Sequence, residues 1–210
     1  MTDEKPFFSI AGAPENSPVM ARLKIRRSEF TCRLARTDSI EAAKAFISKI
    51  SKENKTATHN CWAYIVGDDG RICHSSDAGE PSGTAGKPML NVLTSHHMTR
   101  VTVVVTRQYG GVKLGVRGLI RAYSEAVEAA LAAAKKVRLI QADPVRIQVP
   151  YECNDPVLNQ VRRFNAGIQH TDYKEHIIHD ILVEKHQASD FIQMLSQFEP
   201  QGLKVLSKSD

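Results

Sequence analysis

The chain has 210 residues, and its 42% hydrophobic content is enough to bury a core in one large domain or two small ones. Its N-terminal stretch carries acids where a signal peptide needs basic residues, and no apolar run approaches the roughly 20 residues of a membrane span. We therefore expect a cytoplasmic protein with no membrane partner. Its four cysteines lack CxxC spacing, which favours reduced thiols over a disulfide framework.

Charge is unevenly distributed along the chain, whose formal net charge is +5. Residues 1–142 hold 21 Lys or Arg and 13 Asp or Glu, net +8, whereas residues 143–210 hold 7 and 10, net −3. Between Pro81 and Ser124 there are six Lys or Arg and no acid. This pattern favours a polyanion as the partner of the first half, although a basic surface that is only solvated remains the alternative.

The first predicted elements are strands followed by a helix. Residues 19–36 alternate as in a strand pair or one long bent strand. Asp38 and Glu41 form a capping-box pattern ahead of a helix that ends near Asn54. Five apolar residues share one face of this helix: Ile40, Ala43, Phe46, Ile47 and Ile50.

A hairpin is predicted at residues 61–77, with Gly67 opposite Gly70 at its turn. This pairing places Cys61 and His74 on one face and Cys73 on the other.

Zinc binding, or a thiol beside a base, is one interpretation of this hairpin, because His59 shares the face of Cys61 and His74. Cys73 points away from that face, and a thiol in an apolar strand is more often buried and inert. We therefore predict no metal site.

The segment GEPSGTAGKP is too rich in Gly and Pro for regular structure. It is not a P-loop, because Pro81 and Pro88 stand where that motif needs Gly and Ser or Thr. Thr84 or Gly86 is the predicted N-cap of the following helix, and Gly86 fits better because it leaves Pro88 in the first turn. The backbone donors of Gly83, Thr84 and Gly86 predict a phosphate site or, alternatively, only a turn.

Residues 101–107 are apolar on both faces, as in a central strand. Tyr109, Gly110 and Gly111 then open a long helix whose start presents backbone N–H groups to an anion. Five residues form the predicted buried stripe of this helix: Leu119, Tyr123, Ala126, Ala130 and Leu131.

Cations near the two glycine-rich segments are predicted to contact phosphates. Arg117 and Arg121 lie four residues apart and share an exposed helix face. The predicted phosphate-binding cations are Lys87, Arg107, Lys113, Arg117 and Arg121.

Asp77 and Glu80, with His74, support the alternative of a hydrolase or phosphate-ester enzyme. Such acids more often cap turns or pair with arginine. No complete catalytic triad, metal set or P-loop can be assembled, so we favour binding over catalysis and expect no catalytic residue and no cofactor.

The hydrophobic pattern restarts at residues 142–144 and predicts strand, helix, strand, strand, helix, strand. This βαββαβ order is the ferredoxin-like arrangement. The sequence therefore predicts an α+β protein of two domains, residues 1–142 and 143–210.

Three blocks, HNCWAYIV, SSDAGEPSGTAGKPML and RQYGGVKLGVRGLIRAY, resemble the signature blocks of the YigZ/IMPACT family and span residues 59–123. The resemblance implies a first domain similar to the second domain of a small-subunit ribosomal protein. It implies a second domain similar to a ferredoxin-like domain of elongation factor G. Eukaryotic members regulate translation initiation, which implies a translation-linked, non-enzymatic protein whose partner is RNA, the ribosome or a protein of the translation machinery.

Two positions depart from the family pattern. Gln108 precedes Tyr109 where the family usually has two aromatics, which weakens the prediction of stacking on a double aromatic platform. Arg117 stands where the family commonly has glycine, which makes the surface more basic. A third interpretation is a protein-interaction module whose acidic second domain binds a basic partner.

Overall fold

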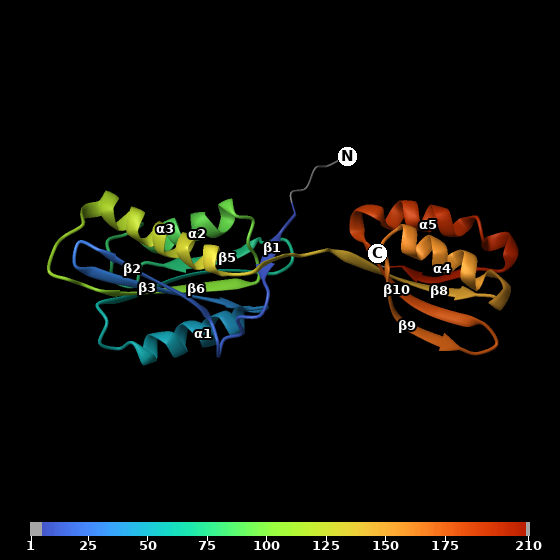
Figure 1. The fold of residues 1–210 in the computed structure, drawn as a ribbon, viewed down its shortest axis with the longest axis horizontal. Helices are drawn as coiled ribbons and strands as arrows, with labels where there is room; N and C mark the ends of the chain where they lie inside the picture. The colour runs from blue at the N-terminus through green and yellow to red at the C-terminus, as the bar shows by residue number, and fades with distance from the viewer. Residues whose placement is uncertain (1–5, 209–210) are drawn as a thin grey trace. The chain divides into compact units, whose positions relative to one another are not determined.

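The structure, a computed structural model, describes residues 6–208 and consists of two compact units, Met1–Leu139 and Ile140–Asp210 (Figure 1). The fold is α+β, as predicted. The first unit contains β1 (Phe8–Ile10), β2 (Val19–Ile25), β3 (Ser28–Arg36), α1 (Ile40–Glu53), β4 (His59–Val66), β5 (Ile72–Ser76), α2 (Gly86–Ser95), β6 (Val101–Gln108), α3 (Gly115–Ala133) and β7 (Lys136–Arg138).

A five-stranded sheet in the order β2-β3-β6-β4-β5 forms the middle layer of the first unit, and all neighbouring strands are antiparallel. Helix α1 covers one face, and α2 and α3 cover the other (Figure 1). Strand β6 is central and buried from Val101 to Arg107, which confirms the prediction of a central strand. The short strands β1 and β7 pair in a separate sheet that the sequence did not predict.

The alternation of β6 divides the core between the two faces. Val103 and Val105 pack in the large cluster under α2 and α3, whereas Val104 packs with Phe46 and Ile50 of α1. All five residues of the predicted α3 stripe are buried, which confirms that helix and its orientation.

Strands β2 and β3 are a hairpin, so residues 19–36 form a strand pair. Ile25 pairs with Ser28, and Arg26 and Arg27 have φ angles of 44° and 72°. These angles are those of a tight two-residue hairpin turn.

Two local predictions were wrong. The N-cap of α1 is Ser39, not Asp38: the Ser39 Oγ accepts from the Ala42 amide at 3.2 Å, whereas Asp38 is paired with Arg36. The β4–β5 turn is longer than predicted.

The longer turn changes which side chains share a face of the β4–β5 hairpin. Val66 pairs with Ile72 and Tyr64 with His74, so Gly67 and Gly70 are not opposite each other. The Arg71 amide donates to Asp69 Oδ1 at 3.1 Å and thereby keeps Arg71 in the loop. His74 consequently lies on the face of Tyr64, opposite the face of Cys61.

The second unit is ferredoxin-like, as predicted. It contains β8 (Ala142–Val149), α4 (Asn154–Arg163), β9 (Gly167–Tyr173), β10 (Ile177–Glu184), α5 (Ala188–Ser196) and β11 (Lys204–Lys208). The sheet is antiparallel in the order β11-β8-β10-β9. Its own core joins strand residues such as Ile147 and Val183 to Val157 of α4 and Phe191 of α5. Across residues 6–208, none of the helices is both long and apolar enough to cross a membrane.

Candidate nucleic-acid interface

The glycine turn between β6 and α3 packs against the tip of the β2–β3 hairpin. A Cβ atom on Gly110 would lie 1.9 Å from the carbonyl oxygen of Arg27, so only glycine fits at this position. The Gly110 amide donates to Ser28 Oγ at 3.3 Å, and the Tyr109 amide donates to Thr58 Oγ1 at 3.0 Å. Segments around residues 27, 58 and 110 therefore meet at one end of the sheet.

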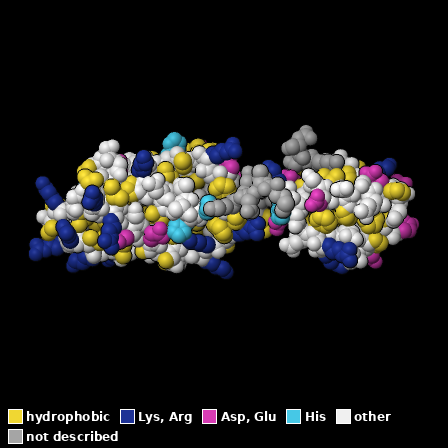
Figure 2. Space-filling model, turned by 90° about the horizontal axis from the view of Figure 1, so that it is seen from above, with side chains coloured by type: hydrophobic (Ala, Val, Ile, Leu, Met, Phe, Trp, Pro, Cys, Tyr) yellow, Lys and Arg dark blue, Asp and Glu magenta, His cyan; other side chains and the backbone are white. Residues whose placement is uncertain are grey.

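Four cations lie on these connected segments. Arg26 and Arg27 form the hairpin turn, Lys113 belongs to the loop before α3, and Arg117 lies in its first turn; all four are exposed. Within residues 6–208 none of them forms an ion pair. In Figure 2, dark-blue side chains crowd the left end of the first unit, where Figure 1 draws the β2–β3 turn and the loop before α3. We call Arg26, Arg27, Tyr109, Lys113 and Arg117 the basic end.

The other predicted cations differ from these four. Arg121 is exposed, but its Nε lies 2.6 Å from Glu125 Oε1, so its charge is partly neutralised. Lys87 is exposed on α2 and belongs to a different element. Arg107 is buried.

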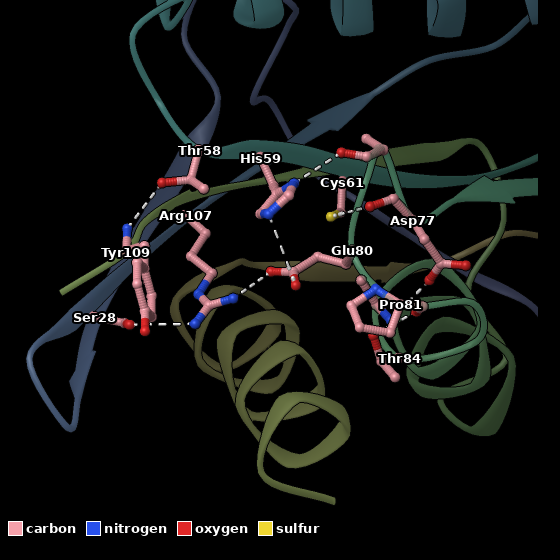
Figure 3. Close-up of polar contacts among 12 residues, drawn as sticks. Ser28, Thr58, His59, Cys61, Asp77, Glu80, Pro81, Thr84, Arg107 and Tyr109 are labelled. Atoms are coloured by element: carbon pink, nitrogen blue, oxygen red, sulfur yellow. Dashed lines mark hydrogen bonds and ion pairs between the residues drawn. The ribbon is translucent and has the colours of Figure 1, made fainter. Parts of the chain in front are cut away.

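Arg107 belongs to a buried polar network (Figure 3). Its Nη1 donates to Glu80 Oε1 at 2.6 Å, and its Nη2 donates to Ser28 Oγ at 3.4 Å. The Tyr123 hydroxyl donates to the same Glu80 oxygen at 2.8 Å. Arg107 thus binds a carboxylate of its own chain, where the sequence predicted a phosphate.

The glycine loop before α2 also holds an internal anion (Figure 3). The carboxylate of Asp77 accepts hydrogen bonds from the amides of Gly83 (2.9 Å), Ala85 (2.8 Å) and Gly86 (2.9 Å). Burial raises the pKa of Asp77, but these hydrogen bonds outweigh it and lower the pKa below its usual value. The Thr84 amide and hydroxyl both donate to the Pro81 carbonyl. The donors that predicted a phosphate site are therefore engaged within the loop.

The N-cap of the helix that follows is Ala85, one residue before the predicted Gly86, which is the first helical residue. Gly86 is required for packing, since a Cβ atom there would lie 2.7 Å from the backbone of Ser76. Pro88 falls in the first turn, where it removes no helical hydrogen bond.

The residues of the enzyme alternative do not come together. His74 lies beside Tyr64 on the α1 face of the sheet, whereas Glu80 is buried on the other face, where Tyr123 of α3 donates to it. His59 lies near Glu80 instead, with Nε2 3.8 Å from Oε2, and its Nδ1 is 3.0 Å from the Ala78 carbonyl oxygen. Within residues 6–208, no group of three His, Cys, Asp or Glu is arranged to hold a metal ion.

The Cys61 thiol is also poorly suited to nucleophilic chemistry. Its Sγ lies 2.9 Å from the Asp77 carbonyl oxygen and 3.3 Å from the Tyr123 hydroxyl. Burial raises its pKa to about 12, so the thiol stays protonated at neutral pH.

Residues 26–131 match the family model of the Impact N-terminal domain. The IMPACT family member YvyE of Bacillus subtilis is 34% identical over 91% of this chain and 86% of its own length. The chain belongs to the IMPACT family. The IMPACT family member YigZ of Escherichia coli is 33% identical over 91% of this chain and 95% of its own. A crystal structure described as that of a hypothetical protein is 32% identical, with a TM-score of 0.62 over 97% of both chains.

The region that matches the IMPACT family model contains the hairpin turn, both glycine-rich segments and the Glu80–Arg107 network. The sequence did not single out Arg26 and Arg27 as site residues. Two adjacent arginines between alternating strands mark only a break in the alternation, and the contact of Arg27 with Gly110 depends on the folded chain.

Proposed function

We propose that this IMPACT-family protein binds RNA, free or in the ribosome, through the basic end, in a translation-linked role without catalysis. The observation that carries the proposal concerns four exposed arginines and lysines, which have no ion-pair partner among residues 6–208 and lie on two segments locked together at Gly110: Arg26, Arg27, Lys113 and Arg117. Cations held in this way suit phosphate groups, which give affinity without reading sequence.

The start of α3 supports the same partner. No side chain caps this helix at Leu114, and the N-terminal end of a helix favours an anion. Open space surrounds the Cα atoms of Gly111 and Gly115, where a Cβ atom would meet nothing within 4 Å. A phosphate could therefore approach the backbone beside Lys113 and Arg117.

We propose RNA as the polyanion, and not another one, because the chain belongs to the IMPACT family. The translation-linked role that the family resemblance implies fits an RNA or ribosomal partner. The hydrolase alternative has less support, because Asp77 and Glu80 are held by contacts within the chain.

The test is the salt dependence of binding to labelled RNA, measured from low to moderate salt. Each neutralised phosphate contributes about 0.7 to 0.9 to the log-log slope, so the double variant Lys113→Ala/Arg117→Ala should flatten it by roughly 1.5 units. The control is Lys44→Ala/Lys52→Ala, which removes the same charge from exposed positions on α1, across the sheet. Equal slopes for the two variants would contradict the proposal for this surface.

Co-sedimentation with ribosomes, with and without nuclease treatment, separates RNA from a protein partner. We expect the parent protein to co-sediment and the Lys113→Ala/Arg117→Ala variant to be released at lower salt. Binding to ribosomes without any affinity for naked RNA would indicate a ribosomal protein as the partner.

A further inference from the structure

Tyr109 is the exposed aromatic side chain among the five residues of the basic end. It is 43% exposed, whereas Phe30 and Tyr123, which pack against each other in the core, are fully buried. A single exposed aromatic residue is common on protein surfaces. Tyr109 differs because its backbone is fixed on both sides, by the Thr58 hydroxyl at its own amide and by the packing of Gly110 against Arg27.

The ring is also supported from within the protein (Figure 3). Arg107 Cζ lies 5.3 Å from the centroid of the Tyr109 ring and 5.4 Å from that of Phe30. The Glu80 carboxylate and Ser28 Oγ hold the guanidinium in place. Arg107 Nε is buried and has no hydrogen-bond partner within residues 6–208.

We infer that Tyr109 is a stacking platform for an unpaired base, so that the basic end takes single-stranded RNA in preference to duplex. This inference rests on the proposed function. Proteins that bind single strands combine cations along the backbone with an aromatic side chain against a base, whereas the base faces of a duplex are covered by its own stacking. Arg26, Arg27, Lys113 and Arg117 would hold the phosphates on either side of that base.

Arg107 is a positioning residue in this arrangement. The residue before Tyr109 is Gln108, which is exposed and not aromatic. Tyr109 therefore has no second aromatic beside it in the turn, and the buried guanidinium supports its ring instead. The platform takes one base.

The experiment compares Tyr109→Leu with Tyr109→Phe, which keeps the ring. The probes are oligoadenylate and a blunt RNA duplex with the same number of phosphates. Loss of one base–aromatic stack should weaken oligoadenylate binding by roughly tenfold in Tyr109→Leu, with duplex binding unchanged and Tyr109→Phe close to the parent. The salt slope should stay the same, because no charge is removed. Circular dichroism and urea unfolding establish that both variants are folded.

Each other outcome overturns the inference in a distinct way. If Tyr109→Leu loses the same affinity for both probes, or loses affinity for neither, then base stacking by Tyr109 is excluded and only phosphate binding remains. If Lys113→Ala/Arg117→Ala also binds like the parent, or the parent binds neither probe, the proposed function falls with the inference. A third outcome is that the parent protein has no affinity for oligoadenylate but Tyr109→Leu no longer binds ribosomes. This outcome would assign the ring to a contact with a protein partner.

Discussion

Glu80 and Arg107 form a buried ion pair that ties the glycine loop before α2 to the central strand β6. Glu80 Oε1 lies 2.6 Å from Arg107 Nη1, and the side chains are 3% and 6% exposed. Tyr123 adds a hydrogen bond from α3 to the same carboxylate oxygen. One acid therefore joins the glycine loop to β6 and α3, the strand and the helix that flank the turn of the basic end.

Glu80→Gln should destabilise the protein, because it leaves the Arg107 charge buried without a counterion. Removing one partner of such a pair costs about 3–5 kcal/mol, and urea unfolding measures it. The control is Glu125→Gln, which breaks the exposed pair with Arg121 and should change the free energy of unfolding by less than ~1 kcal/mol. Similar losses for the two variants would show that burial does not set the strength of the Glu80 pair.

Asp77→Asn should also destabilise the loop, and its effect should depend on pH. The pKa of Asp77 is lowered in the folded protein, so the carboxylate stabilises the fold above its unfolded pKa of about 4. This contribution is lost as pH falls through the folded pKa. The difference in unfolding free energy between parent and variant should therefore be constant near neutral pH and shrink in acid. A difference that persists unchanged in acid would mean that the charge of Asp77 is not what the three amides stabilise.

The contacts of Asp77 and Glu80 within the chain change what we expect when both acids are removed. From charge alone, removing Asp77 and Glu80 should leave RNA binding intact or slightly tighter. Because both acids hold the loop together, we expect the loss of structure to outweigh the gain in net charge.

Helices and strands could be predicted from the sequence where the pattern that determines them is local. The apolar run of β6 and the spacing of the α3 stripe gave the central strand and the buried helix face. Strand alternation also places Arg107 on the face of Val103 and Val105, so the burial of Arg107 could have been predicted from the sequence. Its ion-pair partner could not have been predicted, because a loop residue such as Glu80 has no periodicity that fixes the direction of its side chain.

The site could be only partly predicted because it joins segments far apart in the chain. Arg27 and Gly110 touch only when β3 pairs with β6. The predicted face of His74 was wrong because one residue of turn length exchanges the two faces of a strand. The spacing of Gly67 and Gly70 did not reveal that Asp69 holds Arg71 in the loop.

Gly110→Ala should be far more damaging than Gly111→Ala. At Gly110 the added Cβ would lie 1.9 Å from the Arg27 carbonyl oxygen, so the turn and the hairpin must separate. At Gly111 space is open and the cost is only the positive φ of 81°, about 1–2 kcal/mol. Urea unfolding and RNA binding should both show the difference. Equal behaviour of the two variants would argue against the locked arrangement of the basic end.

Thiol reactivity tests the remaining case for cysteine chemistry. Burial raises the pKa of Cys32 and Cys61 to about 12, whereas Cys73 is exposed. At about pH 8 a disulfide reagent should modify one thiol quickly in the native protein, and Cys73→Ser should abolish that phase. A fast phase that persists in Cys73→Ser and disappears in Cys61→Ser would restore Cys61 as a candidate nucleophile.

The two units should separate under limited proteolysis. The chain divides after Leu139, between the end of β7 at Arg138 and the start of β8 at Ala142, while the sequence alone places the boundary after Ala142. Each unit has its own hydrophobic cluster, so each should remain folded when the connection is cut.

Thermolysin, which cuts before apolar residues, should act first near Ile140, which is 55% exposed. Two resistant fragments should accumulate, and the N-terminal one should retain the RNA affinity and the salt slope of the parent, because the basic end lies within residues 26–117. The urea-denatured chain, cut at many sites under the same conditions, is the control for protease specificity. A native chain that resists cutting near residue 140 would contradict the separation into two units. An N-terminal fragment that is folded but no longer binds RNA would show that the second unit is needed for the function assigned to the first.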